Sequence, residues 1–345
     1  MSRARWALAL AVAGGCSLAP HGTLYRDEVF TAYSPLSRDV EMMRRILTPL
    51  GFRRGQEVLA SRGEAFAEQD IDLRREHFTI YVPPGPPPPA GYGLLVFVSP
   101  ADQALEPRRW RHTLDGHGVI VVSASRAGNS SKVYERRVPL TLLAYENVRA
   151  RFPVDPARVW VGGLSGGARV AEAVALAYPD VFHGLLMNAG SQPIGGERGI
   201  YLPARELFEQ FQRTRVVYVT GGEDEGNLTD DGISRKAMRD WCVLDVEVIV
   251  PPRAGHELLD AAALDRALTF LDGPSRTDPG QLVACNAGID QALAARLAEV
   301  EAAVGAGDRA GARARLDAAD RFFGGLGAPA TLELDDRVSR MAAAP

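Results

Sequence analysis

Seven short apolar runs are spaced along the middle of the chain, and segments of helical periodicity separate them. Such alternation is typical of strands that lie parallel in one sheet, with helices covering both faces of the sheet. We therefore predict an α/β fold with a mostly parallel sheet. The predicted strands are residues 78–82, 94–98, 119–122, 158–162, 185–188, 215–219 and 246–250.

The pattern changes after Gly273-Pro274, where strand-like runs give way to helical spacing. A second helix is predicted at about 308–323, because two glycines follow it as a stop signal, and a third follows Pro329. We expect residues 276–345 to form a small helical appendage. One such unit cannot bury its own apolar face, so it should pack on the sheet domain or on a partner. Its first helix has apolar positions Ile289, Leu293, Leu297, Val300 and Val304.

The start of the chain has the pattern of an export signal. Arg3 and Arg5 precede an apolar stretch that is too short to span a bilayer as a helix. The segment 13–16 then resembles a lipobox, the bacterial signal cleaved before a lipid-modified cysteine. Residues 1–16 therefore predict an exported envelope lipoprotein, anchored through Cys16 to a membrane that faces the periplasm or cell surface. An ordinary secretory signal is the alternative.

Length and composition fit a globular protein with an appendage. The chain has 345 residues, of which 46% are hydrophobic and 24% charged, enough for one large core. The net charge of -4 argues against a broad nucleic-acid surface. We expect residues 17–55 to be a tether containing a short helix at 36–50, and residues 56–275 to form the α/β domain.

No metal or cofactor is predicted. His112 and His117 are not spaced to share one helical face, and no cysteine pair has ligand spacing. The glycine-rich segment 162–167 lacks the Lys-Ser/Thr that a phosphate loop requires. Cys242 and Cys285 are either joined by a disulfide, which export would permit, or are two separate buried thiols.

The segment around Ser165 has the pattern Gly-x-Ser-x-Gly between a predicted strand and a predicted helix. This is the sequence of a nucleophile elbow, a sharp turn that presents a serine hydroxyl at the edge of a sheet. Ser165 is thus a candidate nucleophile, and the N–H of Gly166 a candidate oxyanion donor. The alternative is a serine that only caps the following helix.

A serine nucleophile of this kind needs an acid and a histidine later in the chain, in that order. His256 follows the last predicted strand and is the histidine with the required place and order. Asp224 follows the strand at 215–219 and is our candidate acid. Glu223 and Asp230 remain alternatives, because spacing does not decide which carboxylate reaches the imidazole.

On these segments the chain resembles the polyhydroxybutyrate depolymerase and feruloyl esterase-like α/β-hydrolases. The resemblance implies an α/β-hydrolase fold and a serine hydrolase that acts on carboxylic esters without a cofactor. It implies that Ser165 is the nucleophile, Asp224 the acid and His256 the base. The segments that carry it are 78–83, 94–100, 125–129, 155–159, 163–167, 178–182 and 221–227.

The chain departs from the family after the strand at 94–98. Many relatives have a His-Gly motif there that supplies the second oxyanion donor, whereas this chain has Ser99-Pro100-Ala101. Proline has no N–H, so Ser99 or Ala101 must supply the donor. Asn129 is expected either to line the substrate cleft or to position its loop.

Three functions are compatible with the sequence. The first is hydrolysis of a small or polymeric ester through an acyl-enzyme. The second is a peptidase or amidase with the same triad. The third is a non-catalytic envelope lipoprotein that uses the scaffold for binding, because one fold can serve many functions.

Overall fold

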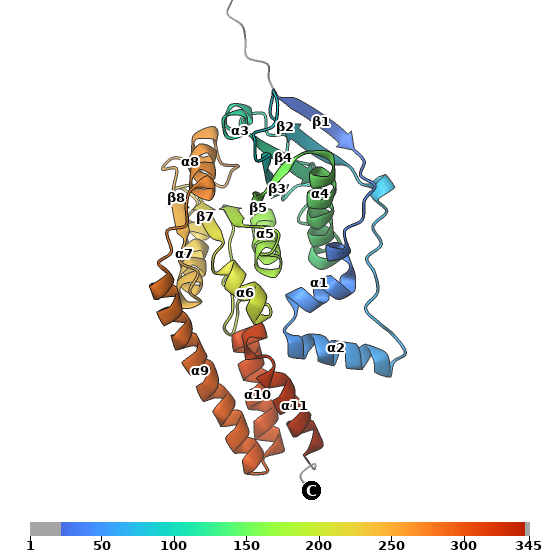
Figure 1. Cartoon of the computed structure of the whole chain (residues 1–345), viewed down its shortest axis with the longest axis vertical. Coiled ribbons are helices and arrows are strands. Elements are labelled where there is room, and N and C mark those ends of the chain that lie inside the picture. The colour runs from blue at the N-terminus through green and yellow to red at the C-terminus, as the bar shows by residue number, and fades with distance from the viewer. Residues whose placement is uncertain (1–21, 342–345) are drawn as a thin grey trace, which may run out of the picture.

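The computed structural model describes residues 22–341, so the predicted signal peptide and Cys16 lie outside the described residues. One sheet of eight strands forms the centre, in the order β1-β2-β4-β3-β5-β6-β7-β8 (Figure 1). The strands are β1 (Thr23–Glu28), β2 (Phe78–Val82), β3 (Tyr92–Val98), β4 (Val119–Ala124), β5 (Val154–Leu164), β6 (Gly184–Asn188), β7 (Arg215–Val219) and β8 (Val246–Ile249).

The sheet is mostly parallel, as predicted. Strands β3 to β8 run parallel to their neighbours, whereas β2 runs antiparallel to both β1 and β4. Parallel strands end at the same edge, so the loops after β3, β5, β6, β7 and β8 emerge together. The candidate residues all lie on loops at this carboxyl edge or at the ends of its strands.

Helices cover both faces because side chains alternate along each strand. In β3, Leu94 and Val96 face the core under α4 and α5, whereas Leu95 and Phe97 face the core under α3 and α8. Both cores are fully apolar at these positions, which explains why the strands read as continuous apolar runs. The helices around the sheet are α1 (Asp39–Ile46), α3 (Arg111–His117), α4 (Val138–Arg151), α5 (Gly166–Ala177), α6 (Arg205–Phe211), α7 (Glu225–Asp240) and α8 (Ala261–Asp272).

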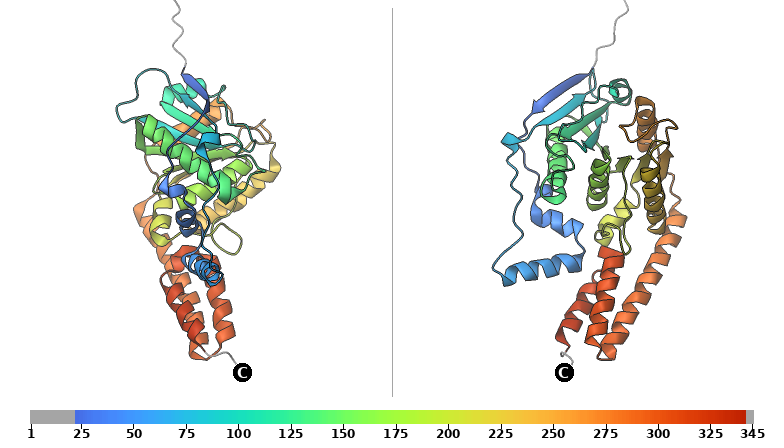
Figure 2. Two further views of the ribbon diagram at one scale, coloured as in Figure 1. Left: turned by 90° about the vertical axis from the view of Figure 1, so that its right-hand side faces the viewer. Right: turned by 180° about the vertical axis from the view of Figure 1, so that it is seen from behind.

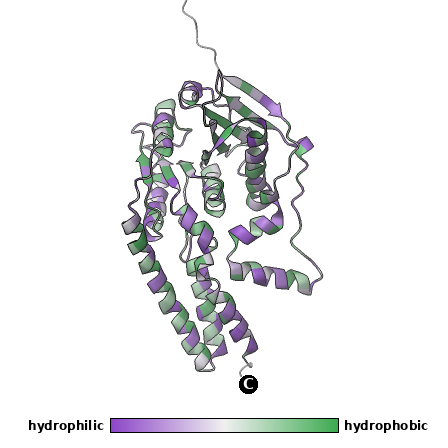
Figure 3. Ribbon diagram, in the orientation of Figure 1, coloured by the Kyte–Doolittle hydropathy of each residue, from purple (hydrophilic) through white to green (hydrophobic). Residues whose placement is uncertain are grey.

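The prediction of a tether at 17–55 is wrong for the part that the structure describes. Residues 23–28 form β1, the edge strand, which pairs with β2. This strand is mostly polar and partly exposed, so its place depends on main-chain pairing rather than on an apolar pattern (Figure 3). The short helix expected at 36–50 is instead two helices, α1 and α2 (Pro49–Ser61).

Helix α2 joins the C-terminal helices, so the domain boundary predicted at residue 56 falls inside an element. Its Leu50 is buried with Val300, Leu316 and Leu334 in a small separate core. Arg53 and Arg54 both bond to the Asp335 carboxylate, at 2.5 and 2.6 Å. Burial raises the pKa of Asp335, but the arginine hydrogen bonds outweigh it and lower the pKa to about 2. The N-terminal segment therefore supports the appendage.

The appendage consists of three helices that extend beyond one end of the sheet (Figures 1 and 2). It contacts the rest of the chain through aromatic side chains, with Phe322 and Phe323 against Trp241. Leu293 and Leu326 are buried in the same core as the inner strands. The helices are α9 (Pro279–Gly305), α10 (Arg309–Phe323) and α11 (Ala330–Arg340). None of the helices that the structure describes is long and apolar enough to cross a membrane.

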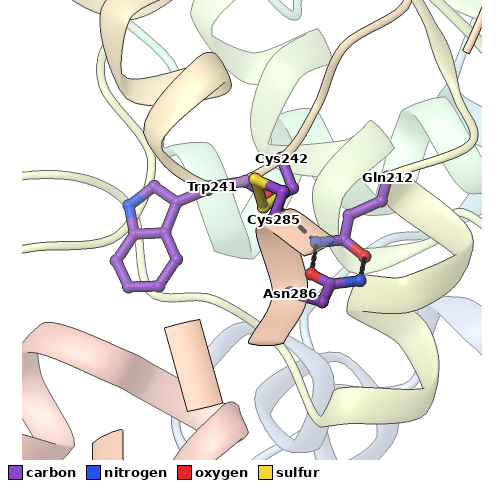
Figure 4. The surroundings of a disulfide bond; sticks show 5 residues. All are labelled: Gln212, Trp241, Cys242, Cys285 and Asn286. Carbon is purple, nitrogen blue, oxygen red and sulfur yellow. Dashed lines mark hydrogen bonds between the residues drawn. A yellow bond between two sulfur atoms is a disulfide. The ribbon is translucent and has the colours of Figure 1, made fainter. Parts of the chain in front are cut away.

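A disulfide between Cys242 and Cys285 joins the end of α7 to α9. Next to it, the side-chain amides of Gln212 and Asn286 exchange two hydrogen bonds, at 2.6 and 3.0 Å (Figure 4). Gln212 also donates to the Trp241 carbonyl at 3.1 Å. Of the two alternatives left open by the sequence, the structure therefore has the disulfide.

We expect loss of this disulfide to lower the free energy of unfolding. The two cysteines are 43 residues apart. Closing a loop of that length lowers the entropy of the unfolded chain, which raises the free energy of unfolding by about 4 kcal/mol. Replacing both Cys242 and Cys285 with serine should therefore lower the urea midpoint, as should reduction of the wild type. Equal midpoints for the oxidised protein, the reduced protein and the double variant would contradict this.

Candidate active site

Ser165 lies at a sharp turn between β5 and α5. Its backbone has φ 56° and ψ -124°, a conformation that costs a non-glycine residue about 1–3 kcal/mol. The turn is tight, because a Cβ on Gly163 would lie 2.4 Å from the Gly167 carbonyl carbon. The Ser165 side chain makes no capping bond to α5, so the structure does not support the helix-cap alternative.

This strained serine at the carboxyl edge of a mostly parallel sheet has the backbone geometry of a nucleophile elbow. The chain has the α/β-hydrolase fold. The sheet order, with β2 antiparallel and the elbow after β5, confirms the fold predicted from the sequence. The fold alone does not establish the reaction, which depends on the side chains around the elbow.

The first turn of α5 packs directly on the end of β3. A Cβ on Gly167 would lie 2.0 Å from the Val98 carbonyl oxygen, so only glycine fits there. A Cβ on Gly166 would lie 2.3 Å from Asn129 Oδ1, which places the Asn129 side chain against the elbow. Gly166 is the first residue of α5, so its N–H has no partner within the helix. That N–H is the predicted oxyanion donor.

Of the two predicted second donors, Ala101 has a partner of its own. Its N–H donates to Ser99 Oγ at 3.1 Å, and Ser99 is buried. The loop is held by Asn129, whose N–H donates to the Pro100 carbonyl at 2.9 Å. Asn129 therefore ties the loop after β4 to the loop after β3, and its side chain also faces the elbow.

Asp224 and His256 are in direct contact, although they come from loops after different strands. His256 Nδ1 lies 2.7 Å from Asp224 Oδ2. A carboxylate only accepts hydrogen bonds, so this contact requires the proton on Nδ1 and leaves Nε2 as a base. The imidazole is half exposed and the carboxylate is mostly buried, with 48% and 10% of the side-chain surface exposed. The His256 ring thus faces solvent, whereas the Asp224 carboxylate does not.

The pKa of Asp224 is lowered from its usual value. Burial acts to raise it, but hydrogen bonds from His256 and Asn227 to the carboxylate outweigh burial. Asn227 Nδ2 donates to the two carboxylate oxygens at 3.0 and 2.9 Å and lies 3.0 Å from His256 Nδ1. The carboxylate is therefore ionised at neutral pH. The sequence analysis missed Asn227, whose position three residues after Asp224 is the only signal it offered.

The other acidic candidates on this loop do not contact the imidazole in the described part of the chain. Asp230 pairs with Arg169 at 3.1 Å, and Glu223 is exposed. Asp231 is buried and accepts hydrogen bonds from Ser191 and Thr220 at 2.6 and 2.7 Å. Asp230 and Asp231 thus bond to other side chains around the site.

Main-chain contacts hold the acid loop against the histidine loop. The N–H of Gly222 donates to the Pro251 carbonyl, and the N–H of Glu223 donates to the Ala254 carbonyl, at 2.8 and 3.0 Å. A Cβ on Gly221 would lie 2.1 Å from the Ala254 carbonyl oxygen, so the approach requires glycine. The two loops form one support for the Asp224–His256 contact.

Asn188 connects this pair to the elbow, and the sequence analysis missed it. Its carbonyl accepts the Ser165 N–H at 2.8 Å. Its buried side chain donates to the Glu257 carbonyl at 3.2 Å and accepts the Leu259 N–H at 2.8 Å. Ser165 and the residue after His256 are thus both bonded to Asn188. Its only signal in the sequence is a polar residue at the end of an apolar strand.

A cavity of about 640 Å³ lies away from these residues, between the loop at 193–199, α7 and the C-terminal helices. Trp241, Ile194 and Phe322 are among its lining residues, and Ser165, Asp224 and His256 are not. In residues 22–341, no cluster of three or more metal-ligating side chains is present.

Comparisons with known proteins found similarities over parts of the chain. No protein-family model matches the chain. Poly(3-hydroxyalkanoate) depolymerase C of Paucimonas lemoignei is 45% identical over 66 residues, which are 19% of this chain and 14% of that enzyme. A ferulic acid esterase structure is 15% identical with a TM-score of 0.43, over 57% of this chain and 91% of its own. The S-formylglutathione hydrolase of Staphylococcus aureus is 15% identical with a TM-score of 0.44, over 57% and 92%.

Proposed function

We propose that this chain is a serine hydrolase that cleaves carboxylic esters through an acyl-enzyme on Ser165. The observation that carries the proposal is the strained Ser165 backbone, joined through Asn188 to the loop that bears His256. The contact between His256 Nδ1 and Asp224 supplies the orienting acid. Backbone strain of this kind costs stability, so it persists only where the surrounding structure enforces it. Such strained residues cluster at functional sites.

In the proposed reaction, Ser165 Oγ attacks the ester carbonyl carbon while His256 Nε2 takes the hydroxyl proton. A bond forms between Oγ and carbon, and the carbonyl electron pair moves onto oxygen. The Gly166 N–H stabilises that oxyanion, together with the Ala101 N–H once substrate replaces its bond to Ser99 Oγ. The ester C–O bond then breaks, and the alcohol leaves with the proton from His256. Water repeats the sequence and releases the acid.

Two features favour ester rather than amide hydrolysis. The relative with 45% identity over a short segment is named as a depolymerase of a poly(3-hydroxyalkanoate), which is a polyester. The base is also half exposed, so an alcohol can depart directly into solvent. An amine is a poorer leaving group than an alcohol and depends more strongly on protonation as it departs, so amides are the more demanding substrates.

The proposal is tested by labelling and turnover of the full chain. We expect a fluorophosphonate probe to attach to Ser165, mapped by peptide mass spectrometry. We also expect turnover of p-nitrophenyl butyrate and none of the matched anilide. Comparable turnover of the anilide would show an amidase. Absence of both labelling and turnover would refute the hydrolase.

We expect Asn227→Ala to lower kcat about tenfold, because it removes hydrogen bonds to a charged group, each worth about 1.5–3 kcal/mol when buried. The pKa of Asp224 should rise, since one of the interactions that lowers it is lost. Carboxyl carbon NMR titration would measure that pKa, and p-nitrophenyl butyrate turnover would measure kcat. Thr229→Ala, an exposed change on the same helix, is the control. An unchanged pKa would contradict the role of Asn227.

A further inference from the structure

Arg137 lies buried beneath the elbow, with only 3% of its surface exposed. Its guanidinium donates three hydrogen bonds to main-chain carbonyl groups. Nε donates to Ala127 at 2.8 Å, Nη2 to Ser99 at 3.1 Å and Nη1 to Gly166 at 3.3 Å. One side chain thus binds the loop after β3, the loop after β4 and the start of α5.

Two of these three carbonyls belong to residues of the proposed oxyanion site. Gly166 carries the first proposed donor, and Ser99 accepts the N–H of Ala101, which carries the second. The rigid planar fork of an arginine fixes the separation of the groups it binds. Arg137 therefore sets the positions of Gly166 and Ser99 relative to each other.

The charge of Arg137 has no carboxylate partner. Within residues 22–341, no acidic oxygen lies within 4.0 Å of its guanidinium nitrogens. Arg45, the other buried arginine in that range, pairs with Glu41 and Asp180. The adjacent Arg136 shows the contrast, because it bonds to the buried carboxylate of Glu76 at 2.5 Å. Burial lowers the pKa of Arg137, but arginine keeps its proton in proteins.

An unpaired buried cation is costly, so its retention requires a reason. Carbonyl acceptors satisfy its hydrogen bonds but leave its positive charge without a neutralising partner. The missing negative charge appears during ester hydrolysis, when the carbonyl oxygen becomes an oxyanion beside Gly166. Interactions that exist only in the transition state raise kcat rather than substrate affinity.

We propose that Arg137 is a positioning residue whose unpaired charge stabilises the oxyanion formed at Ser165. It acts through Gly166 and Ser99 and does not touch substrate. This inference rests on the proposed ester hydrolysis. The tetrahedral intermediate neutralises a charge that the resting protein leaves buried and uncompensated, and the guanidinium holds both donor segments ready before substrate arrives.

The test compares two variants. Arg137→Gln removes the charge and keeps two N–H donors on one nitrogen, whereas Arg137→Lys keeps the charge and loses the planar fork. We expect kcat for p-nitrophenyl butyrate to fall about 100-fold in Arg137→Gln and about tenfold in Arg137→Lys, because removing a single oxyanion donor lowers kcat by about 10²–10³. The KM of both variants should stay within about threefold of the wild-type value. Arg136→Gln is the matched control, because its charge is already paired with Glu76. It should retain wild-type kcat.

A second measurement separates charge from structure. A trifluoromethyl ketone forms an anionic tetrahedral adduct with an active serine, so its affinity should fall in parallel with kcat/KM in both Arg137 variants. Circular dichroism melts establish that each variant is folded. If Arg137→Gln does not fold, the kcat and KM of Arg137→Lys alone test the charge role. Equal kcat losses for Gln and Lys, or a loss confined to KM, would overturn the charge role. Wild type without turnover or labelling would instead refute the proposed hydrolase, and this inference with it.

Discussion

Replacement of Ser165 with alanine is expected to lower kcat by about 10⁴-fold or more, because the nucleophile of an acyl-enzyme mechanism cannot be replaced by water at comparable rate. Fluorophosphonate labelling should disappear as well. The measurement is turnover of p-nitrophenyl butyrate by the full chain, with Ser61→Ala as control. Ser61 is the exposed last residue of α2 and lies outside the proposed site.

Substitution by glycine separates activity from backbone strain at the same position. Ser165 has φ 56° and ψ -124°, which glycine adopts without a Cβ clash. Ser165→Gly should therefore be as inactive as Ser165→Ala but more stable by about 1 kcal/mol, the lower end of the cost of such strain. Urea unfolding of the two variants measures the difference. A Ser165→Ala variant that keeps a tenth of wild-type turnover would rule out Ser165 as the nucleophile.

The inner sheet could be predicted because its strands are buried on both faces. A run such as Leu94 to Val98 is apolar throughout only if helices cover both sides, and the two cores show that they do. The edge strand β1 could not be found in this way, because it is held by main-chain pairing and exposes Arg26 and Asp27 to solvent. Its pattern resembles that of a tether.

The site was predictable where chain order decides it and not where tertiary contact does. His256 follows from the order of the elements, since it is the histidine after the last strand. The other residues act through contacts with segments that are distant in sequence. Asn188 contacts the loop after His256, Asn227 lies beside His256, and Arg137 bonds to the start of α5. No local pattern marks such residues. The pairing of Cys242 with Cys285 has the same origin, because spacing does not determine distance.

The second large effect is expected for Asp224→Asn, which should lower kcat about 10³- to 10⁴-fold while the protein stays folded. An asparagine at 224 can turn its amide N–H toward His256 Nδ1, which then accepts and moves the ring proton to Nε2. A protonated Nε2 cannot take the proton of Ser165. Asp230→Asn is the matched control, because Asp230 lies in α7, the helix that Asp224 caps, but pairs with Arg169. It should change kcat less than about threefold, as expected for a surface ion pair.

Stability and kinetics together distinguish Asp224 from a purely structural carboxylate. Its pKa is lowered in the folded protein, so its ionised form stabilises the fold above the ordinary aspartate pKa, and that contribution is lost as pH falls through the lowered value. Asp224→Asn should remove this pH dependence. Because the members of a triad act as one unit, adding Asp224→Asn to Ser165→Ala should cause no further loss of turnover. A larger loss of kcat in Asp230→Asn than in Asp224→Asn would show that the orienting acid is a different residue. Additive losses of turnover from Asp224→Asn and Ser165→Ala would show the same.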